Sequence, residues 1–161
     1  MTTRARLRKV TLAALAGWFA GALITTPFQV VELVRNAEGD RRLLAYSLGL
    51  GLTLWAIWTL AIACVGLMGA GFPVALWVSP IWLLDRRGKV VATSMAAALL
   101  SVFWRFHLWE ILKPDPFTET TLIVMYGTFA SVFAGVTAVL YLRMLQKPGP
   151  ARGLDSSPPG K

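Results

Sequence analysis

Few side chains in this sequence could do chemistry, and those that could are carried near the far ends of two apolar segments. The polar candidates are Glu32, Arg105, His107 and Glu110. An ionisable group inside a membrane usually faces a partner or a water-filled cavity, which makes it a functional candidate. If both segments are helices, a rise of about 1.5 Å per residue brings all four to a similar depth. Together they form a candidate polar cluster that could bind an ion or a ligand.

The same four residues could instead have only a structural role, and this is the favoured interpretation. Arg105 is close enough to a membrane surface to bury its stem and extend its guanidinium into the headgroups. Glu32 and Arg35 are three residues apart and could form an ion pair on one helix face, as could His107 and Glu110. A ligand or ion site that opens to the non-cytoplasmic side is the alternative.

The rest of the sequence argues against several chemistries. A single histidine cannot supply two axial imidazoles to a membrane haem, and a single cysteine, Cys64, cannot form an internal disulfide or a dithiol relay. No HExxH, glycine-rich phosphate loop or GxSxG motif occurs. We therefore expect no enzymatic activity, no metal site and no cofactor. Cys64 is expected to be a buried, inert thiol.

The segments that must position these residues are long and nearly uncharged. Three stretches contain no Asp, Glu, Lys, Arg or His: Val10–Val31, Leu43–Leu84 and Thr120–Leu142. Val90–Leu112 is interrupted only near its far end. Crossing a membrane takes about 20 apolar residues, and only 15% of this chain is charged, against about a quarter in soluble domains. The sequence predicts an all-α, polytopic membrane protein with four transmembrane helices in a small antiparallel bundle.

Composition divides the chain into three parts. We expect a basic cytoplasmic head over 1–9, a membrane domain over 10–145, and a disordered cytoplasmic tail over 146–161 rich in Pro, Gly and Ser. The predicted spans cover about 10–34, 43–71, 90–112 and 119–143. The first apolar run is longer than that of a signal peptide, so we expect it to stay uncleaved.

The second stretch is the ambiguous one. As one helix, Leu43–Leu84 would be about 63 Å long, too much for one perpendicular crossing. Proline disrupts a helix, so a kink or break is expected near Pro73. Either one span ends near Gly71 and residues 74–84 lie along the interface, or the stretch is a hairpin of two spans. Tryptophans at positions 77 and 82 favour the interfacial segment.

Positive charge indicates the orientation. The net charge is +8, and most Lys and Arg lie in the head, in the segment 85–89 and in the tail. The positive-inside rule then predicts a protein of the plasma (inner) membrane with both termini on the cytoplasmic side. Short basic segments that flank the spans suit anionic lipid headgroups, so we expect membrane lipids, and no nucleic acid, as partners.

Small residues at a spacing of four predict how the spans associate. Helices in lipid associate through close packing of small residues. Gly17 and Gly21 in the first span share one helix face, as do Gly127, Ser131 and Gly135 in the last. Packing within the bundle is the favoured interpretation, and pairing of the Gly127 face with a second copy is the alternative.

These observations leave two classes of function. The first is a non-enzymatic accessory, assembly or lipid-interacting subunit, which would act within a larger membrane complex. The second is an oligomeric small transporter or channel, whose polar mouth would be formed near Glu32, Arg105, His107 and Glu110.

Overall fold

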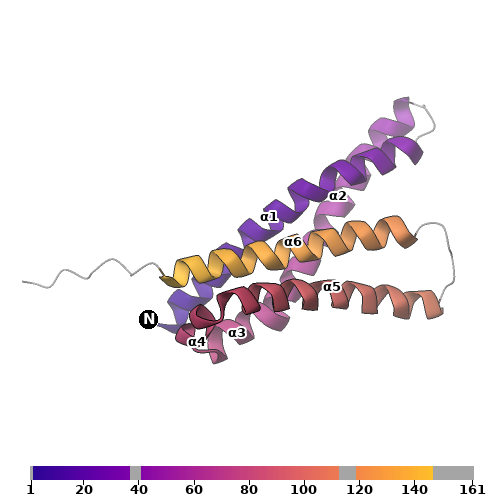
Figure 1. Cartoon of the computed structure of the whole chain (residues 1–161). Coiled ribbons are helices and arrows are strands. Elements are labelled where there is room, and N and C mark those ends of the chain that lie inside the picture. Colours follow the sequence, from indigo (N-terminus) through magenta and orange to yellow (C-terminus); the bar gives the residue numbers. More distant parts are fainter. Residues whose placement is uncertain (1, 37–40, 113–118, 147–161) are drawn as a thin grey trace, which may run out of the picture.

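In the computed structural model the described residues are almost entirely helical (Figure 1). The structure describes residues 2–36, 41–112 and 119–146, with the side chains of all but 36, 41, 106–112 and 119–122. The elements are α1 (Thr3–Asn36), α2 (Arg41–Gly66), the π-helical turn η1 (Leu67–Gly71), α3 (Phe72–Trp77), α4 (Pro80–Asp85), α5 (Arg87–Leu112) and α6 (Glu119–Gln146). No strand occurs in these ranges, so the all-α prediction is confirmed. The predicted tail, apart from residue 146, lies outside the described residues.

Among the described residues, three segments are long and apolar enough to cross a membrane: Thr3–Arg35, Arg42–Trp77 and Ile123–Gln146. These helices fit a membrane protein with transmembrane helices. Helix α1 begins at Thr3 and includes Arg4, Arg6, Arg8 and Lys9, so the residues of the predicted basic head are continuous with the first long helix. Arg and Lys are good helix formers, which allows the helix to continue through them.

The second apolar stretch breaks later than the expected position near Pro73. The helix continues from α2 through η1 and α3 to Trp77, and Val78 and Ser79 then take extended conformations. Proline disfavours the helical conformation in the residue before it, so Ser79 is extended before Pro80. Pro73 is tolerated because it follows the wider turn η1, in which the Phe72 N–H bonds to the Leu67 carbonyl.

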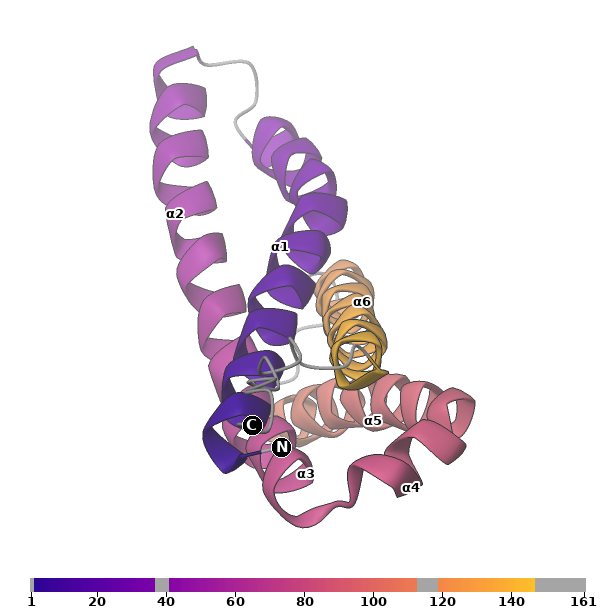
Figure 2. The ribbon, with the colours of Figure 1, turned by 90° about the vertical axis from the view of Figure 1, so that its left-hand side faces the viewer.

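Helix α6 lies between α1 and α5 and contacts both of them (Figure 2). One group of buried residues joins α1, α3, α4 and α6 near the N-terminal end of α1, and its members are Val10, Ala13, Ala75, Leu83, Tyr141 and Leu142. A second group joins α1, α2 and α6, and consists of Ala14, Ala63, Phe129 and Phe133. The core thus follows the α1–α6 contact.

Glycines make both contacts of α6 close. A Cβ atom on Gly17 would lie 2.7 Å from the backbone oxygen of Phe133, and one on Gly21 would lie 2.9 Å from the ring of Phe129. On the other side of α6, a Cβ on Gly135 would lie 3.0 Å from the sulfur of Met95, while Gly127 faces Leu99 at 3.2 Å. Ser131, between them in sequence, is half-buried. The Gly127 face therefore lies against α5 of the same chain.

The helices diverge toward one end of the molecule. The N-terminal ends of α1 and α5 and the C-terminal end of α6 lie together, whereas α1 and α2 rise away from α5 and α6 toward the opposite end (Figure 1). Thr25 is still fully buried on α1, but Phe28 and Val31 beyond it are exposed. We call the end with the N-terminus and α4 the basic end.

Candidate functional site

The structure describes two side chains of the predicted polar cluster, Glu32 and Arg105, so the cluster as a whole stays a prediction. Glu32 is half-buried near the end of α1, and Arg105 is exposed on α5. The parts of α1 and α5 that carry them lie apart, because α1 inclines away with α2 (Figure 1). The side chains of His107 and Glu110 lie outside the described residues. Equal depth along two helices is therefore not accompanied by contact between Glu32 and Arg105.

At the basic end, two cationic side chains of α1 donate hydrogen bonds to backbone carbonyls at the ends of other helices. The guanidinium of Arg6 donates a hydrogen bond to the Val78 carbonyl, and the ammonium of Lys9 donates one to the Met144 carbonyl. Val78 ends α3, and Met144 lies in the last turn of α6, where helix carbonyls lack intrahelical partners. Positive charge is also favourable at a helix C-terminus. The first turns of α1 thus hold the ends of two helices.

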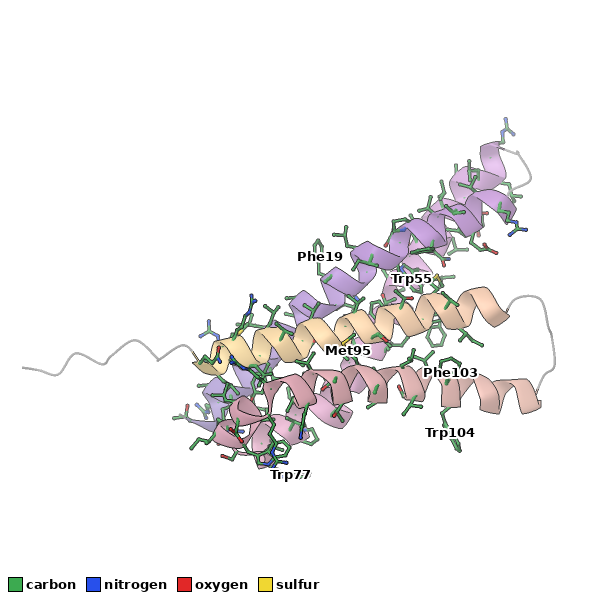
Figure 3. The ribbon with its side chains drawn as sticks, viewed as in Figure 1. Phe19, Trp55, Trp77, Met95, Phe103 and Trp104 are labelled. Atoms are coloured by element: carbon green, nitrogen blue, oxygen red, sulfur yellow. The ribbon has the colours of Figure 1, made fainter. Side chains whose placement is uncertain are left out.

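Further cations at this end are exposed. They come from the start of α1, from the α4–α5 connection and from the end of α6, and they are Arg4, Arg8, Arg86, Arg87, Lys89 and Arg143. Asp85 is the one acidic residue of the segment 77–89. Trp77 lies at this same end (Figure 3). The basic end therefore combines positive charge with exposed aromatic surface.

An aromatic group fills the space between α1, α2 and α6. The Trp55 ring lies 5.3 Å from that of Tyr126 and 6.1 Å from that of Phe129, measured between centroids. The indole N–H of Trp18 donates to the hydroxyl of Thr59 at 3.2 Å. Tilted and edge-on aromatic pairs stabilise beyond their buried area, so this group fixes α2 against α6.

A hollow of about 260 Å³ lies beside this group, between α1 and α2. Its lining is mainly apolar and consists of Trp18, Phe19, Ala22, Leu23, Thr26, Leu52, Trp55 and Ala56. Ligand pockets typically have volumes of about 300–1,000 Å³ and a few convergent polar groups. Its small volume and apolar lining suit an acyl chain better than a polar substrate.

Within the described parts of the chain, no three His, Cys, Asp or Glu side chains lie close enough together to hold a metal ion. Cys64 is exposed, which makes the expectation of a buried thiol wrong. It lies on α2, which presents much of its surface outward.

Comparison with known proteins gives no further guidance, because no family model, no curated protein and no solved structure matches the chain.

Sequence reasoning missed the roles of Arg6 and Lys9. Their side chains were expected only to set topology and to contact headgroups. Their carbonyl partners are distant in sequence, and the Val78 carbonyl became available only through the break before Pro80. The sequence offered one signal for these roles, because the predicted topology returns the end of the last span to the side of the basic head.

Proposed function

We propose that this protein is a four-span protein of a plasma membrane, with both termini cytoplasmic, and that it serves as a non-enzymatic accessory or assembly subunit. The observation that carries the membrane assignment is the exposure of large apolar side chains on several helices. Phe19 on α1, Ile57 on α2 and Leu100 on α5 are each more than half exposed. In water such surfaces would aggregate, whereas lipid requires apolar side chains on the outside of a helix.

In this proposal helix α5 also crosses the membrane, which brings the number of spans to four. Its 26 residues would extend about 39 Å at the usual helical rise, enough for a hydrocarbon core about 30 Å thick. It packs beside α6, which is itself long and apolar enough to cross (Figure 2). Four crossings return the end of α6 to the side of the N-terminus, where most exposed cations of the described residues lie, in agreement with the positive-inside rule.

The accessory role is supported by how the polar and small residues are used. Arg6 and Lys9 bond to helix ends, and the glycines of α1 and α6 permit close helix contacts. The aromatic group of Trp55 fills the core. Much of the exposed surface of the described residues consists of apolar helix faces and the basic end, which suit contact with lipids and with helices of another membrane protein.

The test is purification of the tagged full-length protein in native nanodiscs, with the mass of the assembly and the identity of co-purifying proteins determined by mass spectrometry. We expect one copy of this chain with a defined partner protein that is missing when an unrelated four-span protein carries the tag. A homo-oligomer without a partner would contradict the accessory role and would favour the small transporter or channel.

A further inference from the structure

The connection between α3 and α5 exposes large apolar side chains beside a group of cations. Trp77 is 84% exposed, Ile81 80% and Trp82 47%. In contrast, Leu83 of the same short helix is 2% exposed and belongs to the core. The extended Val78 and Ser79 turn the chain so that α4 buries one side and presents the other. This exposed side is apolar although it adjoins the charged residues 85–89.

Three exposed cations follow directly. Arg86, Arg87 and Lys89 are all exposed, and the segment 77–89 contains one acidic residue, Asp85. The guanidinium carbon of Arg86 lies 5.2 Å from the centroid of the Trp82 ring. At this distance the ring attracts the cation. Apolar and positive groups therefore meet at Trp82 and Arg86, and we call the exposed residues of this segment the basic elbow: Trp77, Ile81, Trp82, Arg86, Arg87 and Lys89.

We infer that the basic elbow binds anionic phospholipids in the membrane leaflet at the basic end. Indole rings favour the boundary between headgroups and acyl chains, which suits Trp77 and Trp82. Ile81 then contacts acyl chains, while the cations pair with headgroup phosphates. The other exposed cations of this end add positive potential. An acidic protein surface would satisfy the cations but would leave Ile81 and Trp77 facing polar groups. This inference rests on the proposed membrane location, and it does not depend on the accessory role.

The test measures lipid selectivity of the full-length protein. The protein is reconstituted in phosphatidylcholine nanodiscs with a minor fraction of phosphatidylglycerol, and the lipids it retains on release are counted by native mass spectrometry. Wild type is expected to enrich phosphatidylglycerol at least about fivefold, the effect of one cation near an anionic surface. The variant R86Q/R87Q/K89Q should lose most of this enrichment.

A matched control changes the same charge at the same end. In R4Q/R8Q/R143Q the basic elbow is intact, so the enrichment should fall clearly less than in R86Q/R87Q/K89Q. Equal losses in the two variants, or no enrichment in wild type, would overturn the inference. If R86Q/R87Q/K89Q fails to fold, wild type measured at about 0.1 M and about 1 M salt replaces it, because the Debye length falls from about 10 Å to about 3 Å. Enrichment that persists at high salt would also overturn it.

The two proposals fail separately. If the protein shows no lipid selectivity, a partner protein can still co-purify with it in nanodiscs. If it purifies as a homo-oligomer without a partner, the basic elbow can still enrich phosphatidylglycerol.

Discussion

Replacing Gly17 by alanine tests the contact between α1 and α6 at its closest point. The new Cβ would lie 2.7 Å from the Phe133 backbone oxygen, whereas ordinary contact begins at 3.4 Å. The new Cβ would also meet the Thr137 hydroxyl and would lie 3.2 Å from the Thr137 backbone nitrogen. The Phe133 oxygen belongs to the backbone of α6 and can move only with the helix. The two helices must therefore separate locally by about 0.7 Å, and such a gap loses a quarter to a half of each van der Waals attraction along the contact.

The cost follows from two opposing terms. Overpacking of a well-packed contact costs about 1–3 kcal/mol, and alanine recovers about 0.5–1 kcal/mol over glycine in a helix. We expect G17A to lower the free energy of unfolding by about 1–2 kcal/mol. The assay is unfolding by sodium dodecyl sulfate of the protein in dodecyl maltoside micelles, followed by circular dichroism.

Two other glycines provide matched controls. Gly49 has no atom within 4 Å of an added Cβ, so G49A should leave stability unchanged or raise it slightly. Gly127 meets only the movable end of Leu99, so G127A should cost less than about 1 kcal/mol. Equal stability of G17A and G49A would refute the close α1–α6 contact.

Two further predictions use the same unfolding assay. Arg6→Met removes the hydrogen bond to the Val78 carbonyl and should lower the free energy of unfolding by about 1 kcal/mol. Arg4→Met changes an exposed cation and should lower it by less than about 0.5 kcal/mol. Equal effects would contradict the capping role of Arg6. Trp55→Ala should cost about 3 kcal/mol because Trp55 is 5% exposed, and Trp58→Ala, at a position 56% exposed, should cost less than about 1 kcal/mol. A reversed order would mean that Trp58, and not Trp55, faces the core.

The helices could be predicted because a membrane span depends on length and on the absence of charge, and both are read directly from sequence. The uncharged stretches correspond to α1, α2 with its continuation, α5 and α6. The break between α3 and α4 was misplaced because both Pro73 and Pro80 disfavour a helix. Tolerance of Pro73 depends on the π-helical turn before it, for which the sequence provides no clear signal.

The candidate site could be predicted less well, because depth along a helix does not determine its tilt. Glu32 and Arg105 were placed at one depth by counting residues. The ends of α1 and α5 lie apart, because α1 inclines away from α5 (Figure 1). The apolar and basic character of the elbow was visible in sequence, but the outward exposure of Trp77 and Ile81 depends on the turn at Val78 and Ser79.

The most direct test of the account is a map of which segments lie on each side of the membrane. Cys64→Ala provides a cysteine-free background, and single cysteines are then placed by Thr2→Cys, Glu38→Cys, Gly88→Cys, Thr118→Cys and Ser157→Cys. A membrane-impermeant maleimide added to intact cells should label positions 38 and 118, and should label 2, 88 and 157 only after permeabilisation. Protection of position 118 together with external labelling of position 157 would show that α5 does not cross, and would contradict the four-span arrangement.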